Sequence, residues 1–594
     1  MSLLRRDVQE PMQKDRAIPM EKKGLAALRD LLKIRRRRRM CKGAILFLVS
    51  CALFWSGAAL LAQAAAPPAP PQPRPQMQTG ECSVRAHGAK GDGVVLETAS
   101  INAAIQECAA RGGGTVVVES GTYLTGTVRL LDNITLRLEA GARLLGSPDL
   151  ADYPPIQRAS EDRNTALIIA ENVHHVAVIG AGTIDGNGRA YAEKSSSHFD
   201  PYFEPAQTRQ GTALVARLAE TREGPVHMRS RPGVLLLVLH SDGVILRDFS
   251  VVDSPNWGVK LMCSRHISVS GLDVRNDVLI PNNDALDVST SSDVTISNSS
   301  LEAGDDALVI GGPCADGWCQ LPEENVVVSN VVLSSRSTAL RIGPVAKDVR
   351  NLTFENIVIR DSNRGICIQA RAGETIENLV FTNIVSRTRL IDGPWWGSGE
   401  PVSMTVARWA YPPWPSAQSA GAQPTGVIRH VRFSNFIAES QSPIVLYSTA
   451  AGGIEDVGFR DLTLTMQSAP LQSVMGGNLD LQPTTPISQG MVRHDLSAIE
   501  AHNVRDLTLT SLQVHWAGSF PAFYRGALHA DHFDGLTLDG FRGQAAAAGV
   551  AALAFDHARN LAIYRAHAEN GPLLAAAIAG KNPKALSAGS AVKK

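Results

Sequence analysis

The chain has 594 residues, of which 44% are hydrophobic, 19% are charged and 5% are aromatic, and it contains 51 glycines. It is a globular protein with room for several domains, and its glycine content suits many short strands and tight turns. The net charge of zero is unevenly divided: residues 1–42 carry 14 Lys and Arg against 5 Asp and Glu, which leaves 43 against 52 elsewhere. The remainder is therefore acidic, and we expect no nucleic-acid partner.

The basic N-terminus leads into an apolar run. Arg35 to Arg39 stand before residues 43–66, which end in small residues that suit a cleavage site. Basic residues ahead of an apolar run mark the cytoplasmic side of an export signal, which explains them better than nucleic-acid binding. We therefore assign residues 1–66 to a basic N-terminus with an export signal and expect a periplasmic or extracellular protein. Two alternatives stay open: residues 43–66 remain as a membrane anchor, or Cys51 is lipidated.

Short strand-like segments recur through the body of the chain. Residues 67–80 form a Pro-rich linker, residues 81–570 contain the repeats, and residues 571–594 are an Ala- and Lys-rich tail. Most repeats place Asn, Asp or His at a turn and then alternate in polarity, with starts often 26 to 32 residues apart. The segments begin at Asn133, Val176, Val244, His266, Asp293, Asn325, Asn351, Asn378, His430, Asp456 and Asn560. This period predicts an all-β fold, a right-handed parallel β-helix, because the hairpins of a sandwich would give shorter and less regular spacing.

A helix is expected at the N-terminal end of the repeats. The stretch from Thr98 to Ala110 is amphipathic and is followed by three glycines, so it would cap the open end of the solenoid. Cys82 with Cys108, and Cys314 with Cys319, are spaced to form disulfides in an oxidising compartment. There is no CxxC pair and no histidine beside these cysteines. We therefore predict disulfides rather than a metal site, and no cofactor.

Three longer intervals interrupt the repeats, at residues 192–232, 392–425 and 471–495. Insertions in a solenoid leave as loops on one face, commonly the binding face. The rings of the second interval either stack on sugars or pack the loop onto the helix, and the sequence favours neither. They belong to Trp395, Trp396, Trp409, Tyr411 and Trp414.

The stretch from Ile280 to Gly311 carries the candidate chemistry. Asp284-Ala-Leu and Asp306-Ala-Leu start 22 residues apart, with Asp305 just before the second. Neighbouring coils stack roughly 4.8 Å apart, which places Asp284 and Asp306 in one column with Asp305 beside them. Three carboxylates without a matching basic cluster repel one another. They therefore indicate acid–base catalysis or a bound cation more than three turn caps.

These motifs resemble glycoside hydrolase family 28, the polygalacturonases and their relatives. The family has Asn-Thr-Asp, Gly-Asp-Asp, Gly-His-Gly and Arg-Ile-Lys on successive coils of a right-handed β-helix. Asn282-Asn283-Asp284 resembles the first motif and Gly304-Asp305-Asp306 the second, within a resemblance that runs from about residue 82 to about 465. It implies an inverting glycosidase in which Asp305 is the general acid and Asp284 and Asp306 hold and deprotonate the water. Such an enzyme separates acid and base by roughly 6.5–9.5 Å.

The other two motifs are missing. When the coils are aligned by their repeated cores, Ser337 takes the place of the family's histidine, and Cys367 and Gln369 take the places of its two cations. The resemblance implies that, in the family, those two cations bind the carboxylate of a galacturonate residue. Arg341 lies in the column of Cys367 one coil earlier, so we predict that it binds substrate; the alternative is an arginine on a solvated strand. The predicted substrate-binding residues are Asn283, Lys260, Arg341, Gln369 and Arg371.

The sequence thus predicts an exported, monomeric glycoside hydrolase that acts on a pectin-related polysaccharide and needs neither cofactor nor metal. Two alternatives remain. A polysaccharide lyase on the same fold would use the carboxylates to bind Ca²⁺. A non-catalytic carbohydrate-binding β-helix would have kept the carboxylates after losing the histidine and the two cations.

Overall fold

The computed structural model of the chain describes most residues from Gly80 onward. The described residues are 80–156, 165–193, 225–312, 319, 321–344, 348–371, 373–393, 395–408, 425–475, 477–481 and 491–575. Contacts divide the chain into residues 1–76 and 77–594, and all described residues belong to the second unit. The predicted export segment, most of the linker and the end of the tail lie outside the described residues. Among the described residues, no helix has the length and apolar character needed to cross a membrane.

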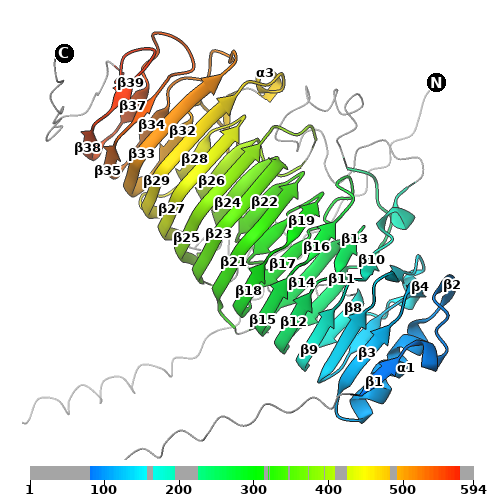
Figure 1. Cartoon of the computed structure of the whole chain (residues 1–594). Coiled ribbons are helices and arrows are strands. Elements are labelled where there is room, and N and C mark those ends of the chain that lie inside the picture. Colours follow the sequence, from blue (N-terminus) through cyan, green and yellow to red (C-terminus); the bar gives the residue numbers. More distant parts are fainter. Residues whose placement is uncertain are drawn as a thin grey trace, which may run out of the picture. The chain divides into compact units, whose positions relative to one another are not determined.

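One stack of parallel strands, here called the site sheet, carries the predicted carboxylates. Each strand pairs with its counterparts on the preceding and following coils, so the strands follow chain order (Figure 1). They are β5 (Val128–Leu130), β8 (Ala166–Glu171), β11 (Val234–Leu239), β14 (Trp257–Met262), β17 (Leu286–Ser289), β20 (Leu308–Ile310), β22 (Thr338–Ile342), β24 (Arg364–Ala370), β26 (Glu400–Val406), β28 (Ile444–Ser448), β32 (Ile499–His502), β34 (Leu528–Asp531) and β37 (Leu553–Asp556).

Two further parallel stacks complete each early coil. The first contains β1 (Glu81–Ser83), β3 (Gly114–Val118), β6 (Ile134–Leu138), β9 (His174–Ile179), β12 (Asp242–Arg247), β15 (Arg265–Ser270) and β18 (Ser292–Ser297). The second contains β2 (Asp92–Leu96), β4 (Gly121–Thr125), β7 (Ala142–Gly146), β10 (Thr183–Asp185), β13 (Ser250–Val252), β16 (Asp273–Arg275) and β19 (Ser300–Ala303).

The two stacks merge in the later coils, because β21 pairs with both β18 and β19. The merged strands are β21 (Glu323–Ser335), β23 (Val349–Ser362), β25 (Thr375–Thr388), β27 (Val427–Ser440), β29 (Ile454–Gln467) and β33 (Val504–Ala517). At the C-terminal end they separate again into β35 (Asp534–Asp539), β36 (Arg542–Gly543), β38 (Arg559–Tyr564) and β39 (His567–Ala568). The predicted parallel β-helix is confirmed.

A helix covers the first coil, as predicted. Helix α1 (Thr98–Ala110) buries Ile101, Ile105 and Cys108 against strands β1, β3 and β5, and the predicted disulfide between Cys82 and Cys108 ties it to β1. The remaining short elements are η1 (Arg85–His87), η2 (Leu150–Asp152), η3 (Gly188–Tyr191), α3 (Gln472–Met475) and the antiparallel pair β30 (Asn478–Asp480) and β31 (Met491–Arg493).

The second predicted disulfide is wrong. Cys319 is bonded to Cys263, 56 residues earlier, and not to Cys314, which lies outside the described residues. Cys263 directly follows β14, and the Cys319 Sγ also contacts the main-chain oxygen of Thr290, which directly follows β17. Cys319 thus lies at the ends of two earlier coils. Proximity in the sequence could not reveal a partner that coil stacking supplies.

The polar residues predicted at the turns set the bends between strands. Asn325, Asn351 and Asn378 have φ values of 60°, 61° and 60°, a left-handed conformation that asparagine tolerates better than most residues. Each also bonds its counterpart one coil away: Asn351 Nδ2 donates to Asn325 Oδ1 at 3.2 Å, and Asn378 Nδ2 donates to Asn351 Oδ1 at 3.1 Å. The turns therefore form an amide ladder along the helix.

Replacing Asn351 by alanine is expected to lower the free energy of unfolding by about 1–2 kcal/mol, because alanine strains at positive φ and both ladder bonds are lost. Asn351→Gly is the matched control, since glycine adopts this φ without strain and should lose less stability. Urea unfolding of the three proteins measures both values. Equal stability of Asn351→Ala and the parent would contradict the role given to the ladder.

The interior of the later coils is filled by identical side chains stacked in register. Phe354, Phe381, Phe433 and Phe459 lie on consecutive merged strands, with ring centroids 4.8, 4.5 and 4.5 Å apart. The spacing equals the distance between neighbouring strands, so each ring packs on the next. The four rings belong to the main hydrophobic core of the chain.

Candidate active site

Two turns of the site sheet bring the three predicted carboxylates together. Asp284 stands two residues before β17 and Asp306 two residues before β20, and the parallel pairing of these strands sets the two aspartates in one column. The Ala285 N–H donates to the main-chain oxygen of Asp306 at 3.0 Å, which holds this register. Asp284, Asp305 and Asp306 are all buried. The arrangement predicted from the 22-residue spacing is therefore present.

Asn283 holds the acid-bearing turn in place. Its Oδ1 accepts from the N–H groups of Gly304 and Asp305 at 2.7 and 3.2 Å, and its Nδ2 donates to the main-chain oxygen of Asp277 at 2.7 Å. The residue is fully buried, and these contacts position the acid-bearing turn; its contact with substrate stays a prediction. Its neighbour Asn282, with φ at 58°, is the residue whose Nδ2 donates to Asp305 Oδ2, at 3.2 Å.

Arg341 supplies the positive charge that the carboxylate motifs lack. It lies on β22 in the column of Cys367 on β24, as predicted. Its Nε donates to Asp306 Oδ2, its Nη1 donates to the Gly343 oxygen at 3.2 Å, and its Nη2 lies 4.0 Å from Asp284 Oδ2. Burial alone would lower the pKa of Arg341, but the surrounding carboxylates, Asp306 first, raise it. The guanidinium therefore bridges carboxylates of neighbouring coils and stays charged.

A fourth carboxylate, Asp287, was missed by the sequence interpretation. It pairs in register with Lys260 on β14, whose Nζ lies 3.5 Å from Asp287 Oδ2 and 3.6 Å from the centroid of the Trp257 ring. Burial raises the pKa of Asp287 despite the opposing charges of Lys260 and Arg341. A signal existed: Asp287 lies three residues after Asp284, as Arg341 lies three residues after Thr338 in the same frame. Lys260 thus belongs to the charged cluster.

Burial and like charge separate the protonation behaviour of the aspartates. Burial, followed by the charge of Asp306, raises the pKa of Asp305 to about 7, although Arg341 opposes this. Burial, followed by the charges of Asp287 and Asp305, raises the pKa of Asp284 well above its usual range. Asp306 is the carboxylate in direct contact with Arg341. The cluster can therefore hold a proton on Asp305 near neutral pH.

Ser337 lies against the acid, at the position predicted for the family's histidine. Its hydroxyl hydrogen-bonds the Asp305 side chain, which lowers the pKa of Asp305, and its Oγ accepts from the N–H of Trp396 at 3.2 Å. The aromatic insertion therefore reaches the site through Trp396. Trp395 is buried, which favours the packing alternative for that ring. The predicted rings of Trp409, Tyr411 and Trp414 lie outside the described residues.

Gln369 and Arg371 are built into the β24 coil. Gln369 is buried, with its Nε2 2.9 Å from Cys367 Sγ. Arg371 is buried and donates to the main-chain oxygens of Thr405 and Leu481 at 2.7 and 2.6 Å. Both side chains hold neighbouring segments together, and their contact with substrate stays a prediction. Of the predicted binding residues, only Arg341 and Lys260 join the carboxylates.

The fold and the site together define a parallel β-helix protein with a buried carboxylate cluster on one sheet. Residues 108–388 match the model of Glycosyl hydrolases family 28. Over these residues the chain is similar to this family, as its motifs indicated.

Several relatives share the same region. The chain is 25% identical over 319 residues to a "Probable polygalacturonase" of Vitis vinifera, covering 49% of this chain and 58% of that protein. It is also 25% identical over 331 residues to the "Exo-poly-alpha-D-galacturonosidase" of Dickeya chrysanthemi, covering 51% and 54%. The match thus spans little more than half of each relative. The solved family 28 exopolygalacturonase of Yersinia enterocolitica shares the fold, with a TM-score of 0.57 and 18% identity over 78% of this chain and 79% of that one.

Proposed function

We propose that the chain is a glycoside hydrolase that cleaves a pectin-related polysaccharide with inversion at the sugar carbon. The observation that carries this is the buried Asp305, with its pKa at about 7, beside an Asp306 held by Arg341. In this account Asp305 protonates the leaving oxygen, and Asp306 with Asp284 holds and deprotonates the attacking water. Among the described residues, Asp284 Oδ1 is buried without a hydrogen-bond partner and offers an acceptor for that water.

The role proposed for Arg341 changes with its observed contacts. A guanidinium bonded to Asp306 and close to Asp284 keeps these two water-holding carboxylates in place. Its first effect on turnover is therefore through these carboxylates, and its contact with substrate is secondary. We expect Arg341→Ala to lower kcat more than it raises KM.

The proposed substrate class rests on the relatives and on one local difference. The relatives are named as a polygalacturonase and a poly-α-D-galacturonosidase. In this chain, the two cation places are taken by Cys367 and Gln369, which are buried. We therefore propose a pectin-related polysaccharide that is modified in one of three ways. Its uronate carboxylates are esterified, its backbone is branched, or neutral sugars replace part of its uronate residues.

A panel of polygalacturonate, methyl-esterified pectin and branched pectic polysaccharides tests this proposal. New reducing ends from the modified substrates, at a higher rate than from polygalacturonate, are expected. Reducing ends from polygalacturonate alone would overturn the substrate proposal and leave hydrolysis intact.

Hydrolysis is favoured over the lyase alternative because positive side chains already contact the carboxylates. Arg341 and Lys260 occupy positions against Asp306 and Asp287, where a lyase would place Ca²⁺ against its ligands. Activity that survives EDTA and gives no ultraviolet-absorbing unsaturated product is expected. Loss of activity with EDTA together with an unsaturated product would assign the chain to the lyases.

The activity should depend on pH through the proton on Asp305. The protonated form is the working form, so kcat is expected to fall as pH rises through about 7, the raised pKa of Asp305. Initial rates at saturating substrate, measured between about pH 5 and 9, give this limb. A kcat that rises across that limb would contradict the assignment of the acid.

Ser337→Ala supplies the control for this limb. Because the Ser337 hydrogen bond lowers the pKa of Asp305, its removal should move the falling limb to higher pH. A limb that moves to lower pH would show that another group controls the rate.

A further inference from the structure

A second cluster of polar side chains lies on the C-terminal coils, away from the residues used above. It consists of His494, Glu500, His502 and His529, each of which offers a ligand atom within 4.8 Å of the others. We propose that these four residues bind one zinc ion, or another divalent first-row metal that prefers imidazole, as a structural centre. The cysteines and their spacing predict no metal site in this chain, and the histidines come together only through coil stacking.

The separations fit a tetrahedral ion. Glu500 Oε2 lies 2.8 Å from His529 Nδ1, 3.3 Å from His502 Nε2 and 3.9 Å from His494 Nδ1. Four ligands at the usual Zn–N and Zn–O distances are about 3.3 Å from one another. The observed distances lie on both sides of this value, so small side-chain shifts would bring the ligands to an ion.

The rings also have the arrangement that such an ion requires. The ring centroids are 5.0 Å apart for His494 and His502, 5.1 Å for His494 and His529, and 5.4 Å for His502 and His529. Imidazoles bound tetrahedrally through one nitrogen place their centroids about 5.2 Å apart. Two of the three pairs meet edge to face, at 89° and 72°. The rings converge on a point and do not form a stack.

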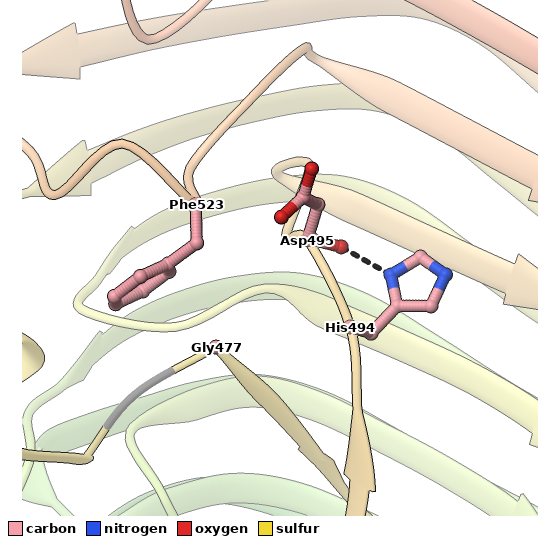
Figure 2. A pocket seen from close by; sticks show the side chains of 4 residues that line it. All are labelled: Gly477, His494, Asp495 and Phe523. Atoms are coloured by element: carbon pink, nitrogen blue, oxygen red, sulfur yellow. Dashed lines mark hydrogen bonds between the residues drawn. The ribbon is translucent and has the colours of Figure 1, made fainter.

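Two of the three imidazoles have a carboxylate oxygen near the ring nitrogen that faces away from Glu500. His529 Nε2 lies 3.2 Å from Asp556 Oδ2, and His502 Nδ1 lies 4.0 Å from Asp531 Oδ2. Carboxylate partners on the second nitrogen orient metal-binding histidines. His494 Nδ1 contacts the main-chain oxygen of Asp495 (Figure 2), so His494 would bind the ion through Nε2 or after releasing this contact.

The position of the cluster indicates what the ion would do. Glu500 and His502 lie on β32, His529 lies on β34, and His494 follows β31 of the antiparallel pair. The other strand of the pair, β30, is held at its end. There Arg371 donates to the main-chain oxygen of Leu481, the residue directly after β30. Four protein ligands fill a tetrahedral shell, which is typical of structural rather than catalytic zinc. The ion would therefore pin the β30–β31 pair to the C-terminal coils.

A small cavity borders this cluster. It has a volume of about 300 Å³ and is lined by Gly477, His494, Asp495 and Phe523. Figure 2 shows the side chains of His494 and Phe523 pointing in opposite directions, and both residues line the cavity. His494 is also the most exposed of the four side chains, at 26% against 0% for Glu500. The cavity therefore lies beside the most exposed ligand of the proposed centre.

The rival arrangement contains no ion. Burial alone would lower the pKa of His529, but hydrogen bonds with Glu500 and Asp556 raise it to about 9. A protonated His529 paired with Glu500 would then satisfy the cluster. The two arrangements differ in whether the purified chain retains metal.

The experiment uses the full chain without a histidine tag, freed of metal with EDTA, incubated with ZnCl₂ and dialysed. We expect about one zinc per chain by elemental analysis, as one tetrahedral centre requires. We also expect a rise in the melting temperature on adding zinc, and the visible absorption of tetrahedral Co²⁺ when cobalt replaces it. His502→Gln and His529→Gln should each lose the zinc and the cobalt spectrum.

His567→Gln is the matched control, because His567 is an exposed histidine on β39 that belongs to neither group of possible metal ligands on the C-terminal coils. It should retain the ion. The melting temperature of each variant in EDTA shows whether it is folded. A folded parent that retains no zinc, or variants that retain as much as the parent, would overturn the proposal.

Discussion

Replacing Asp305 by asparagine is expected to lower kcat by about 10²–10⁴-fold, the usual contribution of a general acid. Asparagine keeps the size of the side chain and an oxygen for Asn282, but it cannot give a proton to the leaving oxygen. KM should change little, because the buried Asp305 acts on the bond and not on the rest of the sugar chain. Initial rates over a range of substrate concentrations separate the two constants.

Stability measurements exclude unfolding as the cause of the loss. The raised pKa of Asp305 shows that its charge is disfavoured in the folded protein, so a neutral amide should leave the melting temperature at pH 8 unchanged or higher. Asp293→Asn is the matched control, because Asp293 is an exposed turn residue whose Oδ1 accepts from Asn325 of the ladder, and it lies outside the carboxylate cluster. An Asp305→Asn variant that is as active as the parent would establish the non-catalytic alternative.

Replacing Arg341 by alanine is expected to lower both stability and turnover. It leaves Asp306 and Asp284 buried without their counter-charge, which should reduce the free energy of unfolding by about 2–4 kcal/mol at neutral pH. This estimate lies toward the low end of the range for buried pairs because the Arg341 side chain is 22% exposed. In turnover, kcat should fall more than KM rises.

The stability loss should depend on pH in a defined direction. Arg341 lowers the pKa of Asp284 and Asp305, so both pKa values rise further without it. A folded aspartate with a raised pKa keeps a proton that the unfolded chain has lost, so stability falls as pH rises above about 4. The difference between parent and variant should therefore be smallest near pH 4 and grow toward neutral pH. Urea unfolding at several pH values measures it.

Arg350→Ala is the control for a surface pair. Arg350 is exposed and bonded to Glu324, and exposed ion pairs contribute little. An Arg341→Ala variant that matches Arg350→Ala in stability, with an altered KM alone, would return Arg341 to the substrate-binding role first predicted.

The features that could be predicted from the sequence are those that repeat. The 22-residue offset between Asp284 and Asp306 fixed their column because the strands that follow them pair in register. The asparagines at the turns are predictable for the same reason, since each coil needs the same left-handed bend. The column shared by Arg341 and Cys367 followed from the same frame, and Asp287 could have been found by applying it once more.

The features that could not be predicted depend on single turns and on insertions. Asn282 and Asn283 are adjacent and identical, yet Asn282 donates to the Asp305 carboxylate whereas Asn283 accepts from the main-chain N–H groups of Gly304 and Asp305. The partner of Cys319 lies two coils earlier. His494 belongs to the 471–495 insertion. This insertion lacks the sequence repeat of the coils, so the place of His494 in the cluster could not be predicted from it.

The stereochemistry of the first product tests the central claim most directly. Proton NMR spectra recorded during the earliest turnover of a pectic oligosaccharide show the anomer of the newly formed reducing end. The proposed acid and water-holding carboxylates predict the anomer opposite to that of the cleaved bond, with a slow return to the equilibrium mixture. A first product with the same anomeric configuration as the cleaved bond would contradict the account. An unsaturated product, as a lyase forms, would contradict it as well.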